Sequence, residues 1–226
     1  MDADERGHQI VHCEDFALSR RVHLQGGAVV ANYRLTAEPG YRFIWAAHAL
    51  LDVSEHARLL AVDGAPTRLF PEAAECLRGP WPDGTRWIEG GWPAPGELRL
   101  DTLGPDDGSA VGAVLSPGGR SATITVLDGP DQLRMTLEAD EQPVSVALWR
   151  NLRGFPPEEP YRSIGVEPML GRVFDLAEAR DGDFALTPAD GEVRWRLTIT
   201  AYRRRAPRVP ADGPGERPSR SARTYP

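Results

Sequence analysis

Apolar and polar residues alternate with a period of two along much of the chain, which indicates β-strands with one buried face. The clearest run ends the ordered part of the sequence: Val193, Trp195, Leu197, Ile199 and Ala201 alternate with polar side chains. The same alternation covers four further segments, residues 29–36, 97–101, 121–126 and 132–138. About ten such strands and almost no helix are typical of an all-β sandwich of large antiparallel sheets.

Two segments are apolar on both faces, FIWAAHALL at 43–51 and VSVALW at 144–149, and are predicted to be central strands. The sequence DGPDQ at 128–132 has proline and glycine where a hairpin turn needs them. One short helix is predicted at 175–180, with Asp175 as its N-cap.

The composition is that of a folded chain, with 41% hydrophobic and 26% charged residues, and 23 glycines and 21 prolines favour many turns. All 26 basic side chains are arginine. The absence of lysine excludes Schiff-base enzymes, P-loop nucleotide sites and protein kinases, because each of these needs a lysine amine.

The charge divides the chain. Residues 203–226 carry a local balance of +5, whereas the other residues carry −12 of the overall −7. The acidic body argues against nucleic acid as a partner, since phosphate binding needs clustered cations. We interpret 1–15 as an N-terminal extension, 16–202 as one domain and 203–226 as a disordered tail rich in proline and arginine.

The cysteines, Cys13 and Cys76, lie far apart and lack the spacing of a zinc site. Free thiols and a cytoplasmic location are expected, with a disulfide as the alternative. The N-terminus lacks an apolar signal region and no stretch is long enough to span a membrane, so no membrane partner is expected. Asp181 and Asp183 lack the further ligands of a calcium site, and no metal is expected.

His48 lies inside the apolar run 43–51, with Ala46 and Leu50 two residues away on its own face. A small neighbour leaves space beside the imidazole, as a catalytic site requires. The alternative is a core histidine that a backbone carbonyl satisfies.

Glu167 lies in RSIGVEPM, where the small residues Ser163 and Gly165 share its face. A glutamate on such a strand is costly unless it is paired or functional. The alternative is an ion pair with Arg150 or Arg162 at the end of the strand, which Pro168 is expected to terminate. His48 and Glu167 together have the residue types of a general acid and base.

Three of the six tryptophans fall in the loop-like stretch 79–96, namely Trp81, Trp87 and Trp92. Exposed aromatic rings there either stack on a sugar or cover one end of the sandwich. Trp45, Trp81 and Arg150 are the candidate sugar-binding side chains.

Three segments together resemble the aldose 1-epimerase, or galactose mutarotase-like, superfamily. They are FIWAAHALLDV, the run WRNLRGFPPEEPYRSIGVEPMLGRVFDLAEA, and the closing strand EVRWRLTITAY. The lead-in FALSRRVHLQGGAVVANYRLT is also similar to the family's paired strands, so the resemblance covers residues 16–202.

The resemblance implies a β-supersandwich that binds a hexose or related sugar and interconverts its anomers. Glu167 would remove the proton of the anomeric hydroxyl, and His48 would protonate the ring oxygen. Proton transfer of this kind implies no cofactor, and a neutral sugar suits an acidic chain without lysine.

The chain departs from the family at its N-terminus, where the family's second histidine and its arginine have no match. The resemblance therefore implies a fold that is incomplete there. Two other functions remain open: a non-catalytic carbohydrate-binding protein of the same fold, and a structural domain that forms a homodimer through an exposed sheet edge.

Overall fold

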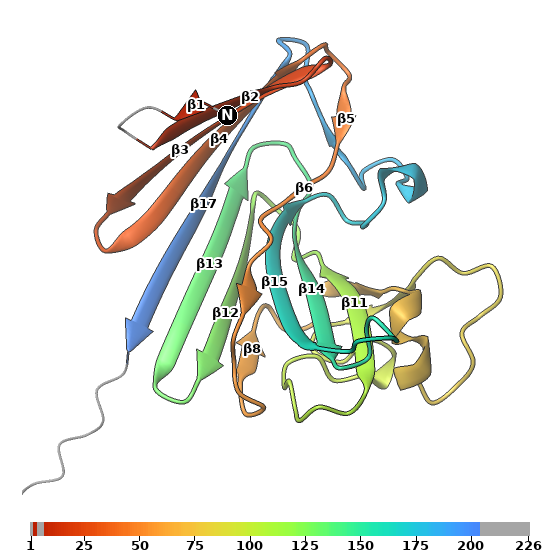
Figure 1. Ribbon diagram of the computed structural model, residues 1–226. Coiled ribbons are helices and arrows are strands. Elements are labelled where there is room, and N and C mark those ends of the chain that lie inside the picture. The colour runs from red at the N-terminus through yellow and green to blue at the C-terminus, as the bar shows by residue number, and fades with distance from the viewer. Residues whose placement is uncertain (1, 4–6, 204–226) are drawn as a thin grey trace, which may run out of the picture.

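The computed structural model describes residues 2–3 and 7–203, whose strands form two large sheets packed face to face (Figure 1). The first sheet has eight strands, and every neighbouring pair in it is antiparallel. In spatial order they are β1 (Asp2–Ala3), β2 (His8–His12), β3 (Phe16–Gln25), β4 (Ala28–Ala37), β17 (Glu192–Arg203), β13 (Asp131–Ala139), β12 (Ser121–Asp128) and β8 (Arg58–Leu60).

The second sheet has seven strands and is also antiparallel throughout. Its order is β10 (Ile88–Gly91), β9 (Pro66–Leu69), β11 (Ser109–Leu115), β14 (Val144–Leu152), β15 (Arg162–Leu170) and β6 (Trp45–Ala46), and β7 (Leu50–Leu51) also pairs with β15. A small third sheet joins β5 (Arg42–Phe43) to β16 (Ala185–Leu186). The predicted all-β fold with large antiparallel sheets is confirmed.

The core lies between the two large sheets, as period-two alternation requires. Val193, Trp195 and Leu197 of β17 are buried there, in the same cluster as Val146 and Val166 of the second sheet. The predicted inward faces of β12 and β13 are confirmed at Ile124, Met135 and Leu137.

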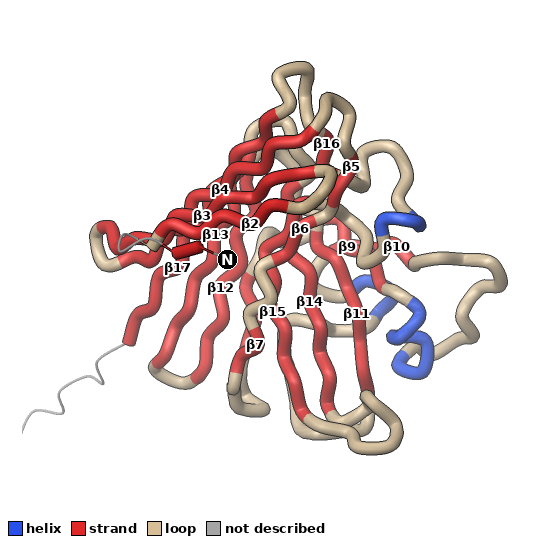
Figure 2. Tube along the Cα trace, turned by 45° about the horizontal axis from the view of Figure 1, so that its top comes forward, coloured by secondary structure: helices blue, strands red, loops and turns tan. Residues whose placement is uncertain are grey.

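The two segments that are apolar on both faces have different outcomes. Residues 144–149 do lie on a central strand, β14, which is buried between β11 and β15. Residues 43–51 do not: they form three two-residue strands, of which β6 and β7 follow the outer edge of β15 (Figure 2). The prediction of a central strand was wrong because one apolar face covers the core while the other borders an open surface.

The predicted strand at 97–101 is also absent. Leu98 and Leu100 follow the 3₁₀ helix η2 (Pro95–Glu97) in an irregular segment, although Leu100 is fully buried. The amide of Leu98 donates to Pro95 O and that of Leu100 to Pro93 O, so local turns replace a ladder. The expected turn at 128–132 is confirmed, since Asp128 and Asp131 pair across Gly129 and Pro130.

Pro168 does not end its strand, contrary to expectation, because β15 continues to Leu170. Its carbonyl accepts a hydrogen bond from the Ala47 amide at 3.0 Å. In an antiparallel sheet the nitrogen and the carbonyl of one residue point to the same neighbouring strand. The Pro168 nitrogen therefore faces residues 47–49, which do not form regular strand hydrogen bonds with β15. The ladder to β14 therefore loses nothing.

At the N-terminal end, strand pairing already occurs before residue 16, the predicted start of the domain. β2 pairs with β3, so the first sheet includes residues 8–12 of the expected extension, and the expected tail lies outside the described residues beyond Arg203. Cys13 and Cys76 are both free thiols. Asp175 caps η3 (Leu176–Glu178), a shorter helix than predicted, by accepting from the Ala177 amide at 2.8 Å. None of the helices in the described residues is long and apolar enough to cross a membrane.

Candidate functional site

Glu167 stands on the face of β15 that points away from the core. Its neighbours Ile164 and Val166 are buried between the sheets, and alternation along the strand places Glu167 and Gly165 on the opposite face. On β14 the partner of Glu167 is Ala147 and the partner of Gly165 is Trp149, so these four residues share one face. We call it the outer face of the second sheet.

The carboxylate of Glu167 folds back over Gly165. A Cβ atom built on Gly165 would lie only 2.7 Å from Glu167 Oε1, which is closer than real contacts allow. The glycine therefore provides the space in which the carboxylate sits, and Glu167 is 7% exposed.

His48 reaches Glu167 because β6 and β7 keep one register along β15. Ala46 pairs with Met169 and Leu50 with Gly165, which places His48 directly opposite Glu167. Between the two short strands the Ala49 amide bonds to the Ala47 carbonyl at 2.9 Å, a three-residue turn centred on His48. This turn interrupts the ladder at the residue that carries the imidazole.

The two side chains are in direct contact: His48 Nδ1 lies 2.9 Å from Glu167 Oε2. The imidazole is 77% exposed, whereas the carboxylate is only 9% exposed. His48 is thus not a core histidine. Nor is Glu167 paired with Arg150 or Arg162, since Arg162 binds Asp106 at 2.8 Å instead. The carboxyl group of Glu167 and the imidazole of His48 are in contact, and both can exchange protons with a ligand on the outer face.

Arg150 lies on the other face of β14. Its partners across the strands are Val111 and Ile164, both of them core residues, and Arg150 itself is 5% exposed. Its Nη1 donates to the Arg99 carbonyl at 2.9 Å. Burial lowers the pKa of this guanidinium, while Cys76 and Asp107 act in the opposite direction. The structure places Arg150 on the core side of the sheet and Glu167 on its outer face, so the two side chains do not line one surface.

The two tryptophans predicted to bind sugar are also not beside Glu167. Trp45 is part of an aromatic cluster with Tyr33 and Trp195, at centroid distances of 4.7 and 5.2 Å, on the inner side of β6. Trp81 lies in the loop before β10, at the opposite edge of the second sheet from β6, and its Nε1 donates to the Thr85 carbonyl at 2.8 Å. Trp87 and Trp92 are buried and belong to the two hydrophobic clusters of the domain.

Two side chains on or over the outer face, Trp149 and Glu72, were not predicted to be there from the sequence. Trp149 was visible as a tryptophan two residues after Ala147 on an apolar strand, but its place beside Gly165 depends on the cross-strand register. Glu72 belongs to the 3₁₀ helix η1 (Pro71–Cys76), which no pattern predicted.

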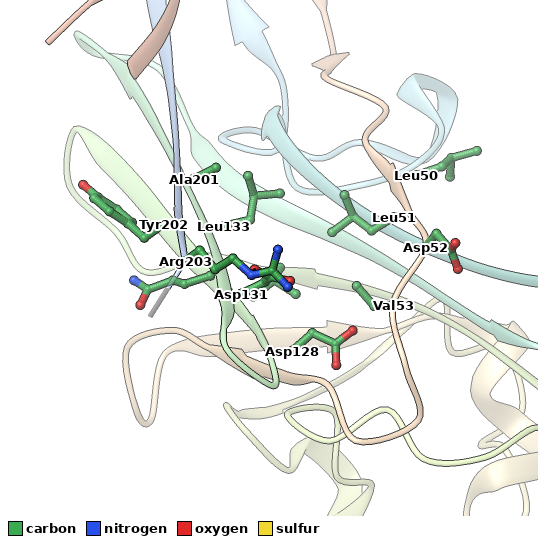
Figure 3. Close-up of a pocket in the computed structure, with 12 residues that line it drawn as sticks. Leu50, Leu51, Asp52, Val53, Asp128, Asp131, Leu133, Ala201, Tyr202 and Arg203 are labelled. Atoms are coloured by element: carbon green, nitrogen blue, oxygen red, sulfur yellow. The ribbon is translucent and has the colours of Figure 1, made fainter. Parts of the chain in front are cut away.

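Two open cavities flank the segment that carries His48. One, of about 460 Å³, is lined by His48, Trp45, Tyr33 and residues of β2, β3 and β17. The other, of about 520 Å³, lies between residues 50–53 and the β12–β13 hairpin (Figure 3). Leu51 points towards the hairpin there and Leu50 points the other way, which agrees with the alternation of faces.

Two carboxylates of the second cavity, those of Asp128 and Asp131, have partners of their own. Asp128 accepts from the Ser54 amide at 2.9 Å and from the Ser54 hydroxyl at 2.5 Å, and these bonds lower the pKa of its carboxyl group. Asp131 pairs with Arg203 at 3.3 Å. We therefore place the candidate site at His48 and Glu167. Within residues 7–203, no group of three or more histidine, cysteine, aspartate or glutamate side chains is arranged to hold a metal ion.

Comparison with known proteins identifies the fold. No family model matches the chain. No curated protein matches it either. Among solved structures, a putative aldose 1-epimerase from Escherichia coli K12 aligns with a TM-score of 0.56 and 14% identity, over 87% of this chain and 68% of that one.

Two further structures have the same architecture. A galactose mutarotase related enzyme from Lactobacillus acidophilus has a TM-score of 0.51 and 13% identity, over 86% of this chain and 71% of its own. A galactose mutarotase-like protein from Lactobacillus casei has a TM-score of 0.51 and 18% identity, over 86% and 68%. At these identities the likeness shows the galactose mutarotase-like fold, and activity is a separate question.

Proposed function

We propose that this chain binds a hexose on the outer face of the second sheet and interconverts its anomers by acid–base catalysis. The observation that carries the proposal is the 2.9 Å contact between His48 Nδ1 and Glu167 Oε2, two groups that come from distant parts of the sequence. The fold shared with a putative aldose 1-epimerase supports the same chemistry.

The anomeric hydroxyl and the ring oxygen of a pyranose are bonded to the same carbon, so a base and an acid that act on them must stand close together. Glu167 takes the proton of the anomeric hydroxyl as C1=O forms. The bond from C1 to the ring oxygen breaks, and the ring oxygen takes a proton from His48. After rotation about the C1–C2 bond the reverse transfers close the ring on either face and restore both groups.

The charge state that this step starts from is a carboxylate beside an imidazolium, in which the contact is an ion pair. Glu167 is sheltered from water and its orientation is set by Gly165, whereas His48 is exposed and free to turn towards a ligand. Positioned proton transfer of this kind contributes about 10²–10⁴-fold to a rate.

The test is polarimetry on fresh α-D-glucose and α-D-galactose with the purified chain. We expect the protein to speed the change in optical rotation, and Glu167→Gln and His48→Asn to lower kcat by about 10²–10⁴-fold. Glu14→Gln and His23→Asn are matched controls, because both residues are exposed and lie on other elements.

A wild-type rate equal to the uncatalysed rate over a panel of hexoses would refute catalysis. A second candidate function then remains, a non-catalytic carbohydrate-binding protein, which the exposed aromatic rings Phe155 and Phe174 favour. Sugar-dependent thermal stabilisation without rate enhancement would identify it.

A further inference from the structure

Trp149 lies between two glycines on the outer face. Gly112 of β11 is its partner on one side and Gly165 of β15 its partner on the other. Neighbouring strands are about 4.8 Å apart, so the two glycines are separated by about 10 Å. Since neither glycine has a side chain, groups from other parts of the chain can occupy the space on both sides of the half-buried Trp149.

A carboxylate lies over each glycine. Glu167 Oε1 is 2.7 Å from the position of a Cβ on Gly165, and Glu72 Oε2 is 3.3 Å from the position of a Cβ on Gly112. η1 is held against β11, because the Phe70 amide that precedes it donates to the Gly112 carbonyl at 3.0 Å. The two carboxylates therefore lie on opposite sides of Trp149.

Among the described residues, no basic side chain pairs with the carboxylate of Glu72. Throughout residues 7–203, no side chain forms a hydrogen bond or ion pair with its carboxylate, which is exposed. Arg68, the arginine that β9 contributes to this face, is instead bound to Asp183 at 2.7 Å and lies over Trp87 at 4.2 Å. The lone pairs of Glu72 are free to accept hydrogen bonds from a ligand.

Two further aromatic rings lie near Trp149, one in contact with the indole and one over Gly112. Phe155, which is 50% exposed, meets Trp149 edge-on with centroids 5.8 Å apart. The ring edge of Phe174, which is 42% exposed, lies 3.2 Å from the position of a Cβ on Gly112. A half-buried indole beside two exposed phenylalanine rings, with an acceptor on each side, suits a sugar, which presents C–H groups on its face and hydroxyl groups at its edge.

We propose that a neutral pyranose stacks on Trp149, with its anomeric end at Glu167 and His48 and its far hydroxyls donating to Glu72. This assignment rests on the proposed function for its orientation, and it names the substrate class. The ring lies over Trp149, and carboxylates above two glycines about 10 Å apart can each accept a hydrogen bond from one end of a hexose. Uronic acids are excluded, because a third carboxylate between Glu72 and Glu167 is repelled by both.

The experiment measures affinity by isothermal titration and kinetics by polarimetry, with D-galactose, D-glucose and D-glucuronate as probes. We expect Glu72→Gln to raise KM for the neutral sugars about tenfold with kcat nearly unchanged. The same substitution should reduce the ratio by which the protein prefers the neutral sugars to D-glucuronate. Trp149→Ala should weaken sugar binding about tenfold or more, and Trp149→Phe, which keeps an aromatic ring, should weaken it less.

Two matched controls accompany these variants. Glu75→Gln changes an exposed carboxylate on the same 3₁₀ helix, and Tyr202→Ala removes an exposed aromatic side chain from β17 in the first sheet. Neither should alter KM. The melting temperature of Glu72→Gln should equal that of the wild type, because the exposed Glu72 side chain has no partner within the part of the chain that the structure describes.

The outcomes separate the two proposals. If the wild type accelerates anomer exchange but Glu72→Gln and Trp149→Ala leave KM unchanged, the subsite is wrong and the catalytic proposal stands. If the wild type binds neutral sugars with the expected dependence on both residues but shows no acceleration, catalysis fails and the subsite stands. If it neither binds nor turns over any of the sugars, both are overturned.

Discussion

The carboxylate of Glu167 occupies the space that a side chain on Gly165 would need, two residues earlier on the same strand. Glu167 Oε1 is 2.7 Å from the position of that Cβ, and the Trp149 Cβ is 3.1 Å from it. The orientation of the proposed base is thus set by the absence of one methyl group, with β14 closing the other side.

Gly165→Ala should therefore displace the carboxylate from His48 while leaving the sheet intact. We expect kcat for anomer exchange to fall by about 10²-fold, the effect of moving a catalytic group by about 1 Å. Polarimetry checks the rate and circular dichroism the fold. Gly79→Ala is the control, because nothing lies within 4 Å of its Cβ position. An unchanged rate in folded Gly165→Ala would show that the glycine does not position Glu167.

Asn151 holds the loop that carries Phe155. It is fully buried, its Oδ1 accepts from the amides of Gly154 and Phe155 at 2.9 and 3.0 Å, and its Nδ2 donates to the Phe155 carbonyl at 2.7 Å. Asn151→Ala leaves these backbone groups unpaired, so the free energy of unfolding should fall by about 3 kcal/mol in urea titrations.

The matched variant for that experiment is Asn32→Ala, an exposed position on β4, where a change below about 0.5 kcal/mol is expected. Equal effects of the two substitutions would mean that the buried amide does not stabilise the loop.

Arg150 is expected to matter for packing and not for sugar binding. Its Nε is buried without a hydrogen-bond partner in the described residues, and burial lowers its pKa. Arg150→Met removes this cost together with one hydrogen bond, so the melting temperature should be equal to or above that of the wild type. The affinity for sugar should not change.

Arg150→Lys serves as the comparison, since it keeps a buried charge but loses the planar donor group, and it should be less stable than Arg150→Met. Loss of sugar affinity in a folded Arg150→Met protein would return Arg150 to the binding site.

Asp106 should make the stability depend on pH in the acid range. It accepts from Arg162 at 2.8 Å and from Arg153 at 2.7 Å, and these bonds, that of Arg162 first, hold the pKa of its carboxyl group below the usual 3.8. Because the folded pKa is below the unfolded one, the stabilisation is complete above pH 3.8 and disappears as the pH falls through the folded value.

Thermal melts of the wild type and Asp106→Asn at pH 6 and at successively lower pH check this. The wild type should melt higher at pH 6, and the difference should shrink towards zero below pH 3.8. A difference that is constant with pH would show that the two arginine contacts do not stabilise the ionised form.

Local patterns were sufficient for the strands whose two sides differ in environment. β12, β13 and β17 alternate because one face is in the core, and that contrast is written into consecutive residues. The pattern was misleading in two segments. Residues 43–51 lie along the edge of the second sheet, and residues 98–101 form an irregular segment after η2. An apolar side chain can be buried without lying on a regular strand.

The amino-acid sequence by itself determined which residues have the chemistry: a histidine after two small residues, and a glutamate two residues after a glycine. Only the tertiary structure decided that they meet, because the register of β6 and β7 along β15 is a pairing between distant segments. The register of β14 along β15 likewise puts Trp149 beside Gly165 and Arg150 beside the core residue Ile164. A side chain's face within one strand follows from alternation, but its neighbour on the next strand follows only from how the sheet is assembled.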